Sequence, residues 1–177
     1  LSAKPDRLHF AAHSHHLWPD ASFDGQMAAW DDAARMADLK WSRIMGPVWE
    51  EAQRHIAREL NLPDPSTIAF SPNTHDFLVR IFSAIPKRPV RVLATDGEFH
   101  SFRRQMARWV EAGEAILTSV SADELAATAQ AGEFDLIFAS HVLFNSGAII
   151  TDLEGLAALA KPEGPWVVID GYHGFMG

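Results

Sequence analysis

Four short apolar runs recur in the second half of the chain, separated by stretches with helical spacing. The runs are continuous rather than alternating, as is typical of strands buried on both faces of a sheet. Parallel strands joined by helices that cover both faces produce this pattern. The sequence therefore predicts a three-layer α/β/α sandwich with a mostly parallel sheet. Its strands are expected at residues 90–94, 115–120, 136–139 and 166–169, and its helices at 77–85, 99–112, 122–131 and 153–160.

The first part of the chain has a different pattern. Residues 1–23 are irregular and rich in histidine, and from residue 24 apolar side chains recur at helical spacing as far as Trp41. Gly46-Pro47 interrupts this pattern, and a second amphipathic helix is expected to end near Leu60. We therefore predict an N-terminal helical segment over residues 1–62 and an α/β domain over 63–177, which begins with a short strand at 67–70.

Composition narrows the class of protein. With 177 residues, 47% of them hydrophobic, the chain can bury the core of one ordinary domain. A net charge of −8 argues against a general nucleic-acid binder, which is usually basic. No apolar run approaches the roughly 18 residues of a membrane span. The sequence contains no cysteine, which excludes disulfides and thiolate metal sites within it and is compatible with a cytoplasmic protein.

Polar or aromatic residues follow four expected strands at the point where each ends. The segments are residues 71–75, at a helix start that can cradle a phosphate, 96–101, 140–147 and 170–173. Taken singly, each segment has a simpler explanation as a helix cap or a structural loop. Because the carboxyl ends of parallel strands meet at one edge of a sheet, we expect one cleft there. Its ligand would carry a phosphate, a flat ring and a ring nitrogen.

The order of these segments resembles that of the class V aminotransferases and kynureninases, which are fold-type I pyridoxal 5′-phosphate (PLP) enzymes. The resemblance covers nearly the whole chain. Residues 12–19 (Ala-His-Ser-His-His-Leu-Trp-Pro) resemble the N-terminal segment that helps enclose the substrate in kynureninases, and residues 37–39 with 46–49 resemble the stretch that follows it. The resemblance implies PLP as cofactor, an amino acid as substrate and a homodimer as the assembly.

The same resemblance implies roles for individual residues. Thr74, with the backbone at Asn73 and His75, would hold the cofactor phosphate. Phe99, or His100 in its place, would stack on the pyridine ring. Asp170 would pair with the pyridine nitrogen and keep it protonated, so that the ring can act as an electron sink. The other candidates are His173 as second catalytic residue near the phenolic oxygen, His141 and Asn145 as weaker cofactor or substrate contacts, and His13 and Ser14 toward the substrate.

One part of the family pattern is not found. The lysine that carries the Schiff base in this family lies beyond the Asp-x-x-His segment, whereas every lysine of this sequence precedes it. We therefore expect the chain to be the N-terminal part of a longer enzyme, inactive without the lysine and the C-terminal small domain. His13 replaces an expected asparagine, and the phosphate turn lacks glycines. The reaction therefore stays open between transamination and kynureninase-like C–C cleavage, with desulfuration less favoured.

Two other classes of function remain. The cluster of His13, His15 and His16 has a spacing that suits zinc, as in a metal-dependent hydrolase. No carboxylate motif with ligand spacing accompanies it, and we expect no metal. The other class is a non-catalytic domain that uses the PLP fold for binding or assembly.

Overall fold

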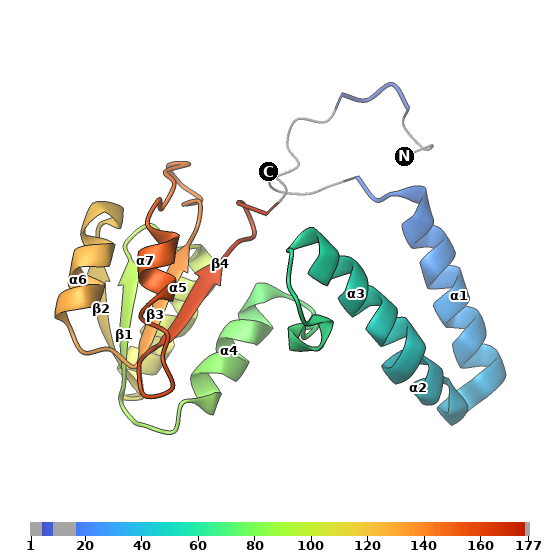
Figure 1. Ribbon diagram of the computed structural model, residues 1–177, viewed down its shortest axis with the longest axis horizontal. Helices are drawn as coiled ribbons and strands as arrows, with labels where there is room; N and C mark the ends of the chain where they lie inside the picture. The colour runs from blue at the N-terminus through green and yellow to red at the C-terminus, as the bar shows by residue number, and fades with distance from the viewer. Residues whose placement is uncertain (1–4, 9–16, 176–177) are drawn as a thin grey trace. The chain divides into compact units, whose positions relative to one another are not determined.

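A computed structural model describes residues 5–8 and 17–175 of the chain (Figure 1). The chain divides into two compact units, one that ends at Phe70 and one that begins at Ser71. Each unit is described by itself below. The boundary expected from the sequence, between residues 62 and 63, stays a prediction.

The N-terminal unit is helical. Helix α1 (Asp20–Met36) is followed by η1 (Ala37–Leu39), where the chain reverses, and by α2 (Lys40–Arg43), η2 (Ile44–Val48) and α3 (Trp49–Glu59) (Figure 1). An ion pair of 2.6 Å between Arg43 Nε and Asp32 Oδ2 joins the two arms of this reversal. Gly46 departs from helical dihedrals, with φ −105° and ψ −108°. The predicted interruption at Gly46-Pro47 is therefore confirmed.

The strand expected at residues 67–70 does not form. A short 3-10 helix, η3 (Pro65–Thr67), occupies the start of this segment, and the Asp64 side chain caps it by accepting from the amide of Ser66. The carbonyl of Ile68 accepts a hydrogen bond of 2.7 Å from the side chain of Gln53 on α3. This side-chain bond takes the place of a strand partner, and the prediction of a strand was wrong.

The second unit is built on a parallel sheet of four strands in the order β2-β1-β3-β4. The strands are β1 (Val90–Thr95), β2 (Ala115–Val120), β3 (Leu136–Ser140) and β4 (Trp166–Asp170), each within one residue of the range expected from its apolar run. The helices are α4 (Thr74–Ala84), α5 (His100–Glu111), α6 (Leu125–Ala131), which follows η4 (Ala122–Glu124), and α7 (Leu153–Ala157).

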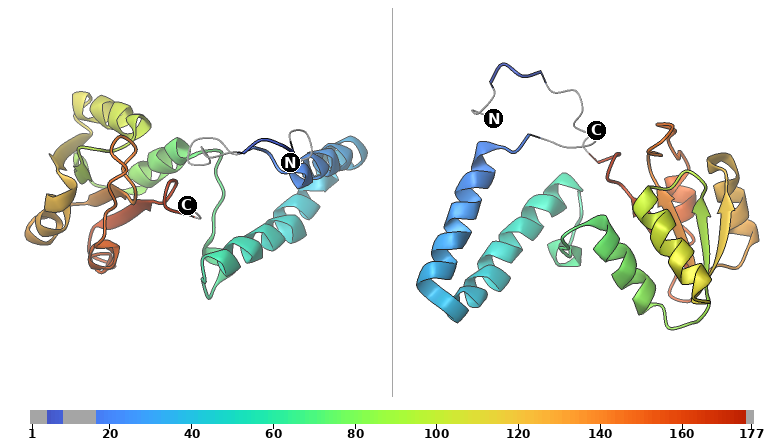
Figure 2. Two further views of the ribbon diagram at one scale, coloured as in Figure 1. Left: turned by 90° about the horizontal axis from the view of Figure 1, so that it is seen from above. Right: turned by 180° about the vertical axis from the view of Figure 1, so that it is seen from behind.

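Two apolar cores lie on opposite faces of this sheet. Phe82 of α4 and Met106 of α5 pack on one face, whereas Leu125 of α6 and Leu156 of α7 pack on the other. All residues of β3 are buried, because helices cover both of its faces. The predicted three-layer sandwich is confirmed, and Figures 1 and 2 show the helices on both sides of the sheet.

The strand order creates a switch point between β1 and β3. From β1 the chain first crosses to β2 on one side and then to β3 on the other. Open α/β sheets bind ligands at the carboxyl ends of the strands beside such a point. Here those ends are Thr95 of β1 and Ser140 of β3, with Asp170 of β4 beside Ser140 in register. The fold thus brings three of the four expected segments to one edge.

No helix in the part of the chain that the structure describes is long and apolar enough to cross a membrane.

Candidate functional site

The start of α4 is a capped helix terminus. The Asn73 side chain accepts a hydrogen bond of 2.9 Å from the amide of Asp76. The amides of Thr74 and His75 lie in the first turn, where backbone N–H groups have no partner within the helix. Both residues are exposed, so these amides can meet a ligand. Asn73 therefore caps the helix, as the simpler explanation from the sequence has it, and the same turn can still bind an anion.

Asp76 places a carboxylate in the same turn. The Ser71 hydroxyl and the Arg80 guanidinium, whose Nε lies 2.6 Å from Asp76 Oδ2, both donate to it. The Ser71 hydrogen bond and then Arg80 lower the pKa of Asp76. Because Arg80 balances its charge, Asp76 does not leave the helix start with an unpaired negative charge.

Asp170 is held at the end of β4 by backbone groups. Its Oδ1 accepts a hydrogen bond of 3.0 Å from the amide of Tyr172, and its carbonyl accepts one of 2.9 Å from the amide of His141. Its other carboxylate oxygen, Oδ2, accepts no hydrogen bond from the residues that the structure describes. The turn after β4 therefore fixes the carboxylate and leaves one oxygen for a ligand.

A hollow of about 340 Å³ joins these two parts of the site. Thr74 and Asp170 both line it, although they come from opposite ends of the second unit's sequence. Its apolar wall includes Phe77 and Ile81 of α4, Phe138 of β3 and Val168 of β4. Pockets that hold small ligands are mostly apolar, with a few placed polar groups, and usually start at about 300 Å³. This hollow has that composition and size.

The rings of Phe99, Phe144 and His173 form a row in which each ring contacts the next. The Phe99 ring lies 5.0 Å from the Phe144 ring in an edge-to-face contact, and the Phe144 ring lies 5.8 Å from that of His173. His100 is exposed, with its ring 3.9 Å from that of Phe99. The structure thus connects Phe99 with His173, while Phe99 and His100 are absent from the lining of the hollow.

The loop after β3 holds His141 through its main chain. The amide of His141 donates to Asp170, and its carbonyl accepts from the amide of Ile150 at 2.9 Å. Gly174 lies so close to the His141 ring that a Cβ there would collide with it. Asn145 is exposed on the same loop. Neither His141 nor Asn145 lines the hollow.

Sequence reasoning missed Glu98. It is 1% exposed, and its Oε1 accepts from the Thr95 hydroxyl at 2.6 Å and from the amide of Ser140 at 3.0 Å. Its Oε2 accepts from the Ser140 hydroxyl at 2.5 Å. Burial raises the pKa of Glu98, the hydrogen bonds from Ser140 and Thr95 oppose this rise, and the charge of Asp170 adds to it. Nothing in the segment Asp96-Gly97-Glu98 signals a buried carboxylate, because two of its three hydrogen bonds come from Ser140 on β3.

His13 and Ser14 lie outside the described residues, as do His15 and His16. Their predicted roles toward a substrate, and the alternative of a zinc site, stay predictions. Within residues 5–8 and 17–175, no group of three His, Asp or Glu side chains could hold a metal ion.

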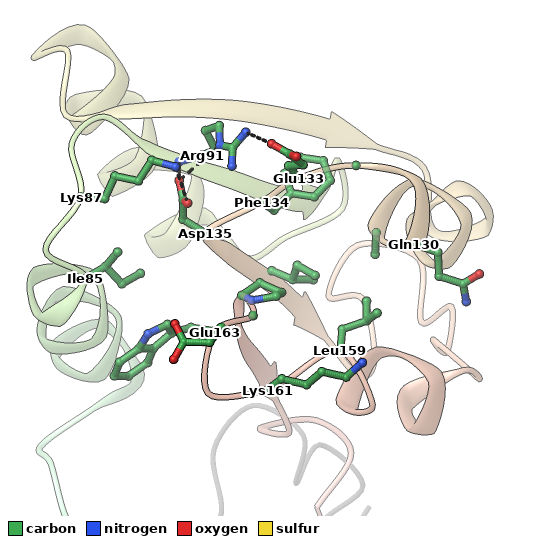
Figure 3. A pocket seen from close by; sticks show the side chains of 16 residues that line it. Ile85, Lys87, Arg91, Gln130, Glu133, Phe134, Asp135, Leu159, Lys161 and Glu163 are labelled. Carbon is green, nitrogen blue, oxygen red and sulfur yellow. Dashed lines mark hydrogen bonds and ion pairs between the residues drawn. The ribbon is translucent and has the colours of Figure 1, made fainter.

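A larger hollow, of about 640 Å³, lies at the opposite end of the sheet (Figure 3). Lys87 Nζ lies 2.9 Å from Asp135 Oδ1, and Arg91 Nη1 lies 3.1 Å from Glu133 Oε2, so four of its charged side chains pair with one another. It opens beside Arg91, Asp135 and Trp166, near the amino ends of the strands. We assign the site to the smaller hollow because it lies at the carboxyl ends.

Eight chains of solved structures match this fold, and two of them are structures of the enzyme C-DES. One is a mutant of C-DES with glycine covalently linked to the PLP cofactor, with a TM-score of 0.77. The other is the cystine C–S lyase C-DES in complex with its reaction product, cysteine persulfide, with a TM-score of 0.76. Both match 98% of this chain at 17% sequence identity.

No protein-family model and no curated protein matches the sequence. The chain spans about half of the matched enzyme, namely 49% of its length. At this level of identity the match establishes the fold. The architecture expected from the resemblance is thereby confirmed: the chain has the fold of one half of C-DES, a PLP-containing cystine C–S lyase.

Proposed function

We propose that the chain is the cofactor-binding half of a PLP-dependent enzyme that acts on an amino acid. The observation that carries this proposal is the hollow lined by both Thr74 and Asp170. Its lining includes a helix start that offers an amide and a hydroxyl, and a strand end that offers a carboxylate. The cofactor has complementary ends, a phosphate and a basic ring nitrogen.

The residues that line the hollow suit the cofactor at two points, and Phe99, which is outside the lining, is a third candidate. The first turn of α4, with Thr74, would bind the phosphate, because amides and the positive end of the helix dipole favour an anion. Asp170 would accept a hydrogen bond from the protonated ring nitrogen and hold the proton there. Phe99, in the aromatic row, would stack on the ring. The bound cofactor would supply an electron sink for the carbanion formed at the substrate Cα.

The remaining candidates have supporting roles. His173, whose ring contacts that of Phe144, would lie near the phenolic oxygen of the cofactor ring. The main-chain bonds of His141 would keep the loop after β3 beside Asp170. Exposed His100 remains the alternative to Phe99 for stacking on the ring, and exposed Asn145 remains a candidate for a cofactor or substrate contact.

We propose first the chemistry that all candidate reactions share, and then the specific reactions. Loss of the proton from the Cα of an amino acid is common to every candidate reaction, and an acidic partner of the ring nitrogen such as Asp170 would serve all of them. Transamination and kynureninase-like C–C cleavage are the reactions that the sequence resemblance favours, and the similarity in fold to a cystine C–S lyase adds C–S cleavage. We further propose that the longer enzyme supplies the Schiff-base lysine and acts as a cytoplasmic homodimer.

Binding of pyridoxine 5′-phosphate to the chain tests this proposal. This compound has the ring and phosphate but no aldehyde, so it cannot bond covalently to a lysine. Replacing Asp170 by Asn removes one charge-assisted hydrogen bond of about 1.5–3 kcal/mol, which corresponds to about 10–100-fold weaker binding. Isothermal titration calorimetry measures this change.

Asp123→Asn is the matched control, since Asp123 is an exposed carboxylate of η4 outside the hollow. It should bind like the unmodified chain. Failure of the chain to bind the probe, or equal loss of binding in both variants, contradicts the proposal.

A further inference from the structure

Glu98 lies at the switch point of the sheet and has no role in the function proposed above. It follows β1 by three residues and accepts hydrogen bonds from the last residues of both β1 and β3. Its side chain therefore bridges the two strand ends. A carboxylate that is 1% exposed is uncommon unless it is paired with a positive charge. No positive side chain among the described residues is bonded to it.

The hydrogen bonds of Glu98 are compatible with both of its protonation states. Oε1 accepts from a backbone amide, so that oxygen is an acceptor in either state. Oε2 faces only a hydroxyl, that of Ser140, at 2.5 Å. A hydroxyl can rotate to donate to a carboxylate or to accept from a carboxylic acid. A proton can therefore join or leave Oε2 while the heavy atoms stay in place.

Glu98 is also coupled to Asp170. Ser140, which bonds to Glu98, is the register partner of Asp170 across β3 and β4. The negative charge of Asp170 raises the pKa of Glu98, together with the larger effect of burial. The other titratable groups near these strand ends are Asp96, His100, His141, Tyr172 and His173, and none of them is among the causes of this shift. A positive charge placed against Asp170 therefore favours ionisation of Glu98.

We propose that Glu98 is a positioning residue that stores a proton next to Asp170 and releases it to solvent when a protonated pyridine ring binds there. The inference rests on the proposed function. One negative charge forms at Glu98 as one positive charge arrives at Asp170, so the buried site keeps its charge balance. In the ligand-free chain the stored proton prevents two neighbouring carboxylates from being ionised together.

The test counts protons during binding. Calorimetric titrations with pyridoxine 5′-phosphate in buffers of different ionisation enthalpy give the number of protons released. Glu98→Gln keeps the size of the side chain and can accept from Thr95 and donate to Ser140, but it cannot ionise. The ligand's own proton changes are common to both proteins and cancel. We expect the unmodified chain to release up to about one proton more than Glu98→Gln, at pH values between the pKa of Glu98 in the free and bound chains.

Glu163→Gln is the control, because Glu163 is exposed and lines the hollow at the opposite end of the sheet. It should release as many protons as the unmodified chain. Binding with equal proton counts in the unmodified chain and Glu98→Gln overturns the inference and leaves the proposed function intact. Absence of binding overturns the proposed function, and the inference with it.

A second measurement does not need the Glu98→Gln variant and serves if that variant does not fold. Carbon-13 NMR of the glutamate carboxyl groups follows the titration of Glu98 in the unmodified chain, with the signal assigned through its contacts to Thr95 and Ser140. The midpoint should fall when the probe binds, and it should also fall in ligand-free Asp170→Asn. A midpoint unmoved by both changes overturns the inference.

Discussion

Ser140→Ala tests the buried bond at the switch point. Ser140 is 5% exposed, and its hydroxyl donates to Glu98, which is 1% exposed, so water cannot readily replace the lost donor. A hydrogen bond to a charged group contributes about 1.5–3 kcal/mol, and one between neutral groups about 0.5–1.5 kcal/mol. The free energy of unfolding should therefore fall by about 1.5–3 kcal/mol where Glu98 is ionised and by less where it is protonated.

The sign of the pH dependence follows from the pKa of Glu98. The Ser140 hydrogen bond lowers this pKa, so its removal moves the folded-state value further above that of the unfolded chain. A group with a raised folded-state pKa contributes stability at low pH that is lost as the pH rises through that value. The destabilisation of Ser140→Ala relative to the unmodified chain should therefore grow as the pH rises.

Urea denaturation at a series of pH values measures both quantities. Ser119→Ala is the control, since Ser119 lies on β2 near the same edge of the sheet but is exposed. The control accounts for the change from serine to alanine in a strand, and it should stay within about 0.5 kcal/mol of the unmodified chain. If Ser140→Ala costs no more than this control, or if its cost shrinks with rising pH, the reasoning about Glu98 is wrong.

Two further predictions concern other parts of the second unit. Asn73→Ala removes the side-chain cap of α4 and should lower the free energy of unfolding by about 1 kcal/mol in urea denaturation, with exposed Asn145→Ala as the neutral reference. Burial raises the pKa of Asp135, but Lys87 and the amide and charge of Arg91 lower it, and the net pKa lies below its usual value. The ionised Asp135 therefore stabilises the fold above the pKa of the unfolded chain, and this stability is lost as the pH falls through the pKa of the folded chain. Asp135→Asn should lower the free energy of unfolding at neutral pH and have no such effect in acid. A loss of stability that is the same at every pH contradicts the assignment.

The sheet could be predicted from the sequence because each strand carries its own signal. The run Ala115–Val120 is apolar at its start and bounded by polar turns, and the observed strand has the predicted limits. The expected strand at 67–70 had the same composition signal, but a strand also needs a partner. There the side chain of Gln53 bonds to Ile68 instead. Periodicity describes a segment, whereas pairing depends on distant residues.

The sequence predicted which segments reach the edge of the sheet, but not which side chains contact one another there. Thr74 and Asp170 were expected at one edge because parallel strands end there, and they do line one hollow. The contact of Phe144 with both Phe99 and His173 depends on how the loop after β3 folds back, which no local pattern specifies. The buried state of Glu98 depends on Ser140, which lies 42 residues away in the sequence. Such contacts follow from tertiary structure alone.

The strand order also makes the two halves of the site unequal in local stability. Glu98 is bonded to β1 and β3, which are central strands, whereas Asp170 ends β4, which pairs only with β3 among the described strands. Edge elements open locally at a lower free energy than the centre of a sheet. The end of β4 with the Asp170 carboxylate can thus open locally while Glu98 stays bonded to β1 and β3. A ligand bound to Asp170 would make local opening of the end of β4 less favourable, and would therefore slow the hydrogen exchange of β4 amides.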